Sequence, residues 1–294
     1  MNPGQKLRQL LGGPKAVLMP GAANALTARI AEEAGFRVVL FTGAGFSNME
    51  LGDPDLGLTT LTEVVQQVGR MAEAVDLPVV ADADTGFGNP LNVRRTVREL
   101  ERAGAAAIVL EDQVSPKRCG HFEGKQVIGQ DEMVMKLVAA LDARRNPDTV
   151  IIARTDARAV SGLADAIARA QAYEKAGVDA TFVEAPRTVD ELAEIPRRLG
   201  VPQMCNMVEG GKTPVLPLET LERMGYRLIC YANAALRGAI KGMQVVLQGL
   251  ARDGGTEKVL DQMVSWEERQ RLVRLPEYNK LEARYAAPDT AKSR

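Results

Sequence analysis

The sequence predicts a (β/α)₈ barrel, and three observations support this fold class. The chain has 294 residues, and an α/β barrel of this kind typically takes about 250. Apolar residues make up 46% of the chain, which is enough for a sizeable core. Short apolar runs alternate with amphipathic stretches at a spacing of roughly 25 residues, the order expected where parallel strands alternate with helices.

Eight short apolar runs are the predicted strands. They lack the alternation of apolar and polar residues that marks half-exposed strands, as expected of parallel strands buried on both faces. In chain order they lie in segments 16–21, 36–43, 77–84, 105–112, 148–156, 178–185, 201–207 and 226–233.

Helical stretches separate these runs. In segments 91–104 and 162–177, alanine, leucine and valine return every three or four residues, which predicts helices with one apolar face. Five helices end in a glycine, where a helix commonly turns into the left-handed conformation that costs glycine little. These glycines are Gly35, Gly104, Gly177, Gly200 and Gly225. A doubly wound open sheet is the alternative fold, but the first turn lacks the GxGxxG pattern.

The chain is expected to form one domain, with the barrel in about 14–250 and a helical extension in about 251–294 that ends in a polar tail. Lysine plus arginine (37) nearly balances aspartate plus glutamate (38), so charge does not indicate a nucleic-acid partner. We find no signal peptide and no segment that could span a bilayer. The three cysteines lack a CxxC spacing, which favours a reducing compartment. We therefore expect a soluble cytoplasmic protein.

Six predicted strands end in polar residues, and in such barrels the chemistry lies at the C-terminal ends of the strands. The strand ends are Thr42-Gly43-Ala44, Asp82-Ala83-Asp84, Glu111-Asp112-Gln113, Arg154-Thr155-Asp156, Glu184 and Asn206. Asp82 and Asp84 alternate, so both are expected to point the same way, and Glu111 ends the next strand. Crowded carboxylates need a cation, and oxygen ligands suit Mg²⁺ or Mn²⁺. Alternatively, Asp84 caps the next turn and Asp82 pairs with Arg154, which explains one acid and not three.

The segment SPKRCGHFEGK, residues 115–125, follows the fourth strand and holds the single histidine, His121. A loop of this length over a barrel mouth is often a lid. Lys117, Arg118 and a protonated His121 are expected to lower the pKa of the Cys119 thiol. Cys119 is thus predicted to be an acid or base carried onto a bound substrate, with His121 orienting the loop.

Five motifs occur in order at successive strand ends: ADADTGFGN, LEDQ, PKRCGH, ARTDAR and NMVEGGKTP. Together they resemble the isocitrate lyase/phosphoenolpyruvate mutase superfamily over nearly the whole chain. The KRCGH loop is similar to that of the carbon–carbon lyase branch, which includes 2-methylisocitrate lyase, 2,3-dimethylmalate lyase and oxaloacetate acetylhydrolase. Methylisocitrate lyases usually have a tyrosine at the position of Phe41, SGGG in place of TGAG, and NITEFG in place of NMVEGG. The chain therefore looks closer to dimethylmalate lyase and its relatives.

The resemblance implies roles for most of the candidate site residues. The carboxylates around Mg²⁺, some acting through water, are implied to be Asp55, Asp82, Asp84 and Glu111. Substrate binding is implied for the backbone amides of Thr42, Gly43 and Ala44, and for Asn206 and Arg237, and we assign Gly120 to it as well. Catalysis is implied for Cys119 as the acid of the gating loop and for Arg154 at the enolate oxygen. Glu184 is implied to be a further pocket residue, and we assign Glu184 and His121 to catalysis as well.

The resemblance also implies an activity: Mg²⁺-dependent cleavage of the C2–C3 bond of a 2-hydroxy dicarboxylate, of the 2,3-dimethylmalate or 2-methylisocitrate type. The products are an α-keto acid such as pyruvate and a second carboxylate, formed through a metal-stabilised enolate that Cys119 protonates. The alternatives are an oxaloacetate hydrolase or decarboxylase, a phosphonopyruvate-type mutase or hydrolase, and a barrel that only senses a dicarboxylate. The helices after Arg237 resemble a segment exchanged between subunits, which implies a homotetramer built as a dimer of dimers, without nucleic-acid or membrane partners.

Overall fold

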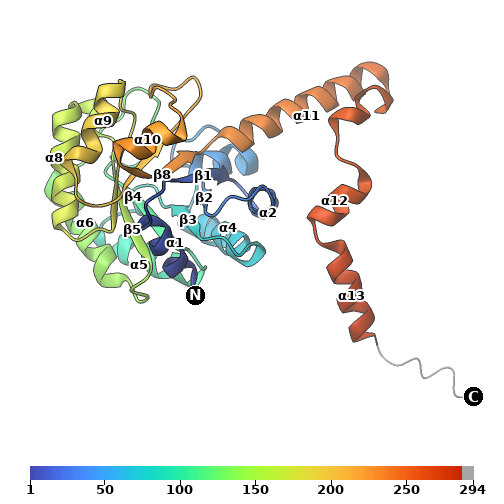
Figure 1. The fold of residues 1–294 in the computed structure, drawn as a ribbon, viewed down its shortest axis with the longest axis horizontal. Helices are drawn as coiled ribbons and strands as arrows, with labels where there is room; N and C mark the ends of the chain where they lie inside the picture. The colour runs from blue at the N-terminus through green and yellow to red at the C-terminus, as the bar shows by residue number, and fades with distance from the viewer. Residues whose placement is uncertain (287–294) are drawn as a thin grey trace, which may run out of the picture. The chain divides into compact units, whose positions relative to one another are not determined.

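The computed structural model describes residues 1–286, and its central feature is a closed barrel of eight parallel strands (Figure 1). Each strand pairs with the next in sequence, and β8 pairs with β1 to close the barrel. The strands are β1 (Val17–Ala22), β2 (Val39–Phe41), β3 (Val79–Asp82), β4 (Ala107–Glu111), β5 (Val150–Thr155), β6 (Ala180–Val183), β7 (Gln203–Asn206) and β8 (Tyr226–Tyr231). The predicted (β/α)₈ fold class is confirmed.

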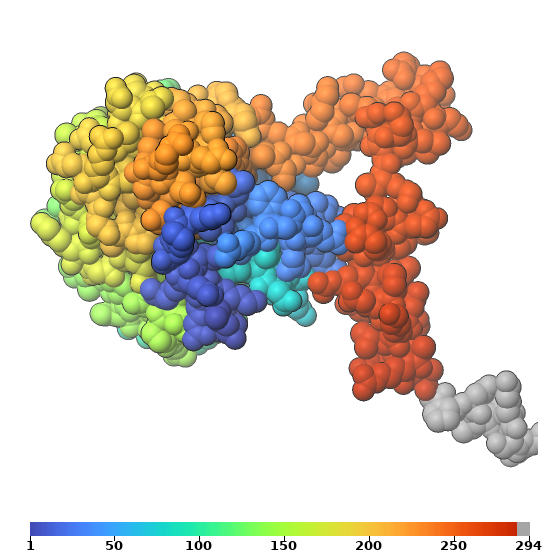
Figure 2. All heavy atoms as spheres, viewed as in Figure 1, coloured from blue at the N-terminus to red at the C-terminus, as the bar shows by residue number. Residues whose placement is uncertain are grey.

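Helices connect the strands and cover the outside of the barrel; in the space-filling view α8 and α9 form part of that outer surface (Figure 2). Those up to residue 143 are α1 (Pro3–Leu11), α2 (Ala25–Glu33), α3 (Gly43–Phe46), the π-helix η1 (Ser47–Leu51), α4 (Leu61–Ala74), α5 (Pro90–Arg102) and α6 (Gln130–Ala143). They are followed by α7 (Ala157–Val160), α8 (Leu163–Lys175), α9 (Val189–Arg198), α10 (Leu218–Met224) and α11 (Ala234–Asp253). The last elements are the 3₁₀-helix η2 (Glu257–Gln262), α12 (Trp266–Leu272) and α13 (Leu275–Tyr285).

The strands divide their side chains between two cores because successive residues of a strand point to opposite faces. The core inside the barrel includes Val38, Leu40, Val80, Val109, Ile152, Phe182 and Met204. The core between the strands and the helices includes Val39, Phe41, Ala81, Ile108, Leu110 and Ile151. The inward-facing position that follows the last apolar residue of a strand therefore reaches the mouth of the barrel.

Four of the five predicted helix-ending glycines have the left-handed conformation: Gly35, Gly104, Gly177 and Gly225 have φ of 85°, 93°, 99° and 110°. The prediction for Gly200 is wrong. α9 ends at Arg198 and is followed by an extended Leu199, and the Gly200 N–H donates to the Glu174 carboxylate at 3.1 Å.

The chain divides into two compact units, and the division falls inside α11, between Arg237 and Gly238. In the second unit, α12 and α13 contain no buried residue. Among residues 1–286, no helix has the length and hydrophobicity needed to cross a bilayer. The polar tail predicted at 287–294 lies outside the described residues.

Candidate active site

The mouth of the barrel is lined by side chains that continue the inward-facing rows of six strands, β2 to β7. Each lies two residues beyond an apolar residue of the inner core: Thr42, Asp82, Glu111, Arg154, Glu184 and Asn206. A cavity beneath the mouth has an apolar wall that includes Leu40, Phe182, Met204 and Cys230, with Thr42, Asp82, Arg154 and Asn206 as its polar groups. The six strand ends singled out in the sequence thus meet in one place.

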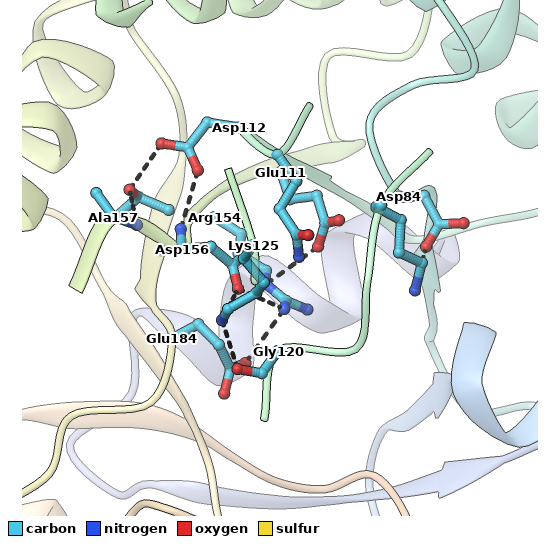
Figure 3. Close-up of polar contacts among 12 residues, drawn as sticks. Asp84, Glu111, Asp112, Gly120, Lys125, Arg154, Asp156, Ala157 and Glu184 are labelled. Carbon is cyan, nitrogen blue, oxygen red and sulfur yellow. Dashed lines mark hydrogen bonds and ion pairs between the residues drawn. The ribbon is translucent and has the colours of Figure 1, made fainter. Parts of the chain in front are cut away.

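Arg154, on β5, lies among three carboxylates (Figure 3). Its Nε atom is 3.2 Å from Glu111 Oε2 and 2.9 Å from Asp156 Oδ2, and its Nη2 atom is 3.7 Å from Glu184 Oε2. Burial lowers the pKa of Arg154, but Asp156, Glu111 and Glu184 outweigh burial and hold this pKa well above its usual value. Arg154 is therefore a permanent cation at the mouth, suited to an oxyanion.

Asp82 and Asp84 face a common point beside Gly43. A Cβ atom on Gly43 would lie 3.2 Å from Asp82 Oδ2 and 3.5 Å from Asp84 Oδ1. β3 ends at Asp82, and Asp84 has φ of 47°, so Asp84 lies past the strand rather than on it as predicted. Asp82 accepts hydrogen bonds from the N–H groups of Gly43 at 3.3 Å and Asp84 at 3.2 Å. Among the ion pairs of the described residues, none joins Asp82 to Arg154, so the alternative interpretation of Asp82 is wrong.

Lys117 reaches from the loop into this acidic group. Its Nζ atom is 2.5 Å from Asp55 Oδ1 and 2.9 Å from Asp84 Oδ1, and its side chain is buried. The pKa of Asp84 is raised to about 6: burial is the largest cause, Lys117 opposes it, and Asp82 and Asp55 add to it. The sequence had not revealed this pairing.

The acidic residues suit a divalent ion that keeps several of its waters, rather than an ion enclosed by protein ligands alone. Glu111 Oε1 is buried and accepts no hydrogen bond. Glu111 Oε2 and Asp84 Oδ1 each lie beside one cation, Arg154 Nε at 3.2 Å and Lys117 Nζ at 2.9 Å. Burial raises the pKa of Glu111 well above its usual value, and Arg154 and Lys117 oppose this rise only in part. Within residues 1–286, no three His, Cys, Asp or Glu side chains are placed to hold an ion unaided. Mg²⁺ keeps several waters and binds through one or two carboxylates plus substrate oxygens, so Asp82, Asp84 and Glu111 suit it.

The loop after β4 lies over the mouth in a closed position. The Cys119 N–H donates to the Asp55 carbonyl oxygen at 3.1 Å. A Cβ atom on Gly120 would lie 2.5 Å from Arg154 Nη2 and 2.7 Å from Glu184 Cγ. The backbone at Gly120 therefore approaches the pocket as closely as a glycine allows.

His121 connects this loop to the segment that follows β7. Its Nδ1 atom accepts a hydrogen bond from the Lys212 N–H at 3.1 Å, so the proton of a neutral imidazole is on Nε2. That Nε2 atom is 3.2 Å from Glu184 Oε1. Burial raises the pKa of Glu184, but Arg154 and His121 outweigh it and the net pKa is lowered. Glu184 is therefore an anion beneath the closed loop.

The prediction of a lowered thiol pKa at Cys119 is wrong. Burial raises the pKa of Cys119 above its usual value, and nearby carboxylates add to the rise. Lys117 is engaged by Asp55 and Asp84, and Arg118 is exposed. Cys119 thus keeps its proton at neutral pH, which suits a proton donor rather than a thiolate nucleophile.

Two of the residues discussed from the sequence lie away from this cluster. The Arg237 side chain is more than half exposed, and its Nη1 atom donates to the Glu209 carbonyl oxygen at 2.7 Å. Phe41 packs in the outer core, with its ring 5.5 Å from that of Phe46. A hydroxyl group at position 41 would not reach the mouth, whereas Leu40 lines the cavity.

Sequence reasoning left Gln113, Lys125 and Asp156 without a role. Asp156 forms ion pairs with two cations: its Oδ2 atom is 2.9 Å from Arg154 Nε, and its Oδ1 atom is 2.6 Å from Lys125 Nζ. Gln113 and Asp156 follow strands that were correctly located, so their position was a usable signal. Lys125 follows a glycine in a charged loop and gave no signal, because a lysine there is normally solvated.

Comparisons with known proteins agree with this architecture. Residues 7–251 match the family model described as phosphoenolpyruvate phosphomutase. The chain is 45% identical over 286 residues to 2,3-dimethylmalate lyase from Eubacterium barkeri, covering 97% of this chain and 99% of that protein. It is 42% identical over 281 residues to 2-methylisocitrate lyase from Aeropyrum pernix, covering 96% and 90%.

Solved structures give the same result. A crystal structure of 2,3-dimethylmalate lyase matches with a TM-score of 0.92 at 35% identity, covering 99% of this chain and 98% of that one. Oxaloacetate acetylhydrolase in complex with 3,3-difluorooxalacetate matches with 0.93 at 32% identity, covering 98% of each chain. Phosphonopyruvate hydrolase in complex with oxalate and Mg²⁺ matches with 0.87 at 32% identity, covering 97% and 99%. The barrel, the strand-end groups and these matches lead to one conclusion: the chain belongs to the phosphoenolpyruvate mutase/isocitrate lyase superfamily.

Proposed function

We propose that the protein is a Mg²⁺-dependent lyase that cleaves the C2–C3 bond of an alkyl-substituted 2-hydroxy dicarboxylate such as 2,3-dimethylmalate. The observation that carries the proposal is the closed loop, which holds a protonated thiol at Cys119 and lays Gly120 directly on Arg154 and Glu184. A proton donor on this loop would be available to a carbanion-like product formed in the pocket. The proposal also follows the names of the lyases that the chain resembles.

The substrate's first carboxylate and C2 oxygen would lie between the Thr42–Ala44 segment and the acidic residues. When bound, Mg²⁺ held by Asp82, Asp84 and Glu111 supplies Lewis acidity and a template for these oxygens. Arg154 carries a permanent charge toward the same space and would stabilise the negative charge that develops on the enolate oxygen.

Bond cleavage would proceed in two proton transfers. A base removes the proton of the C2 hydroxyl, the C2–C3 electron pair moves to C3, and the α-keto acid and the enolate of the second carboxylate form. The Cys119 thiol then donates its proton to C3 of that enolate. The Glu184–His121 contact holds the loop over the pocket while this happens, and the closed loop excludes water that would weaken each electrostatic contact.

The cavity wall supports an alkyl-substituted substrate. Leu40, Phe182, Met204 and Cys230 present no charge to a substituent on C2 or C3, and such pockets favour apolar groups. Methyl groups would bury well there, whereas a third carboxylate would lose its hydration, because Arg154, the cation that lines the cavity, already lies beside the carboxylates of Glu111, Asp156 and Glu184. This observation favours the dimethylmalate type over the methylisocitrate type.

The proposed function is tested by turnover in Mg²⁺ buffer with four substrates. Pyruvate release from 2,3-dimethylmalate is expected to exceed release from 2-methylisocitrate, measured through lactate dehydrogenase and NADH absorbance. Oxaloacetate, followed by ¹H NMR for oxalate and acetate, and phosphonopyruvate, followed by ³¹P NMR, cover the alternative activities of the superfamily. Faster turnover of either of these two substrates would contradict the proposal in favour of a hydrolase or mutase.

We propose further that four chains assemble, with the unit that begins at Gly238 packed against other subunits. The supporting observation is a set of large apolar side chains left exposed within this unit, including Leu247 (60%), Trp266 (66%) and Tyr278 (62%). A set of exposed apolar side chains of this size is typical of a surface that packs against another protein chain. Light scattering after gel filtration is expected to give a mass four times that of one chain. The mass of one chain at micromolar concentration would contradict the assembly.

We also propose a cytoplasmic location, because all three cysteines are free thiols.

A further inference from the structure

Two side chains that do not line the barrel cavity hold the backbone on either side of Cys119. Gln113 holds the residue before it: Gln113 Nε2 donates to the Arg118 carbonyl oxygen at 2.8 Å, and the Arg118 N–H donates to Gln113 Oε1 at 2.9 Å. Lys125 holds the residue after it, because Lys125 Nζ donates to the Gly120 carbonyl oxygen. The peptide groups that flank the thiol are thus fixed from both sides.

Both side chains are buried and anchored to the barrel. Gln113 is 1% exposed and lies two residues past the end of β4, where it forms an isolated antiparallel bridge with Val127. Lys125 Nζ is 2.6 Å from Oδ1 of Asp156, a fully buried residue just past β5 (Figure 3). A buried amide or ammonium group with such partners is held far more firmly than a surface one.

We propose that Gln113 and Lys125 are positioning residues, which set where the Cys119 thiol stands over the pocket. Asp156 extends this arrangement, because its carboxylate also lies 2.9 Å from Arg154 Nε. The cation that holds the loop and the cation that faces the substrate therefore share one anion. The thiol's part in turnover rests on the proposed function, but its position does not.

A surface contact of the same loop provides the matched control. Glu123 Oε1 is 2.5 Å from Lys212 Nζ, but the Glu123 side chain is 82% exposed. An exposed ion pair contributes little because water and salt screen it. Glu123→Gln therefore removes a charge from the loop without removing a buried hydrogen bond to its backbone.

Alkylation of Cys119 by iodoacetamide reads the position of the thiol without any substrate. Cys205 and Cys230 are buried, and Cys119→Ala gives the background rate. Lys125→Met and Gln113→Leu are each expected to raise the alkylation rate at least about tenfold, because each loses hydrogen bonds that keep the loop closed. Glu123→Gln is expected to stay within about twofold. In turnover, the two positioning variants should lower kcat more than they change KM, because the thiol acts after the substrate binds.

Thermal melting checks that each variant folds, and Lys125→Gln replaces Lys125→Met if the latter does not. Alkylation at the wild-type rate in the folded Lys125 and Gln113 variants would overturn the proposal, as would an equal rise in Glu123→Gln. A tenfold rise in alkylation alongside a wild-type enzyme that cleaves no 2-hydroxy dicarboxylate would support the positioning role and reject the proposed function. The two failures are thereby distinguishable.

Discussion

Replacing Cys119 by serine is expected to lower kcat by about 10²–10⁴-fold, the contribution typical of a positioned general acid. A hydroxyl group is nearly the same size as a thiol, so the loop should still close, and the bond from the backbone N–H of residue 119 to the Asp55 carbonyl oxygen is untouched. The hydroxyl is a much weaker acid, however, and it cannot protonate the enolate carbon at a useful rate. The loss should therefore appear in kcat, with KM nearly unchanged.

Steady-state kinetics of Cys119→Ser with the best substrate of the screen measure this loss, and calorimetry with Mg²⁺ checks that metal affinity is retained. Cys205→Ser is the matched control, because Cys205 is buried in the core between β7 and the helices and should keep kcat within a few-fold. Turnover in D₂O adds a direct readout: wild-type enzyme should place deuterium on the C3-derived carbon of the second product. A Cys119→Ser enzyme with near wild-type kcat would refute the acid assignment.

Replacing Asp84 by alanine is expected to lower Mg²⁺-dependent activity by at least about 10³-fold, on the scale of losing a principal electrostatic group at a reacting centre. Asp84 shares the space beside Gly43 with Asp82, and its buried Oδ1 atom is 2.9 Å from Lys117 Nζ. Removing it leaves one carboxylate fewer for the ion and leaves Lys117 with Asp55 as its close ion-pair partner. Both changes weaken the attraction of the mouth for a divalent cation.

Titration of activity with Mg²⁺ and with Mn²⁺ measures the Asp84→Ala effect, and thermal melting separates it from unfolding. Asp142→Ala is the control, because this carboxylate is 67% exposed on α6 and pairs only weakly, at 3.9 Å, with Arg94. An Asp84→Ala enzyme with an unchanged metal titration would remove Asp84 from the ion's ligands.

The barrel and its mouth could be predicted from the sequence because both depend on short-range periodicity. Each strand is too apolar to be anything but buried, and a polar residue two places past Leu40, Val80 or Ile152 must emerge at the same end. The outer face follows the same rule in reverse: Asp112 points outward and accepts a bond from the Tyr173 hydroxyl at 2.8 Å.

The loop was harder to predict because its contacts are long-range. Lys117 and Asp55 are 62 residues apart in the chain. No local sequence pattern predicts that a loop lysine will pair with so distant a carboxylate rather than lie beside the neighbouring cysteine. The thiol pKa was therefore predicted in the wrong direction. Burial decides it, and burial depends on where the closed loop lies.

The tight fit at Gly120 separates possession of reactive groups from the ability to use them. A chain with alanine at this position could retain every acid, the arginine and the thiol, and still be held ajar by one methyl group wedged against Arg154 Nη2. Such a molecule would bind its ligand in a pocket that stays open to solvent, and it would release the ligand unaltered. A single hydrogen atom in place of a methyl group thus marks the difference between a receptor and a catalyst built on the same scaffold.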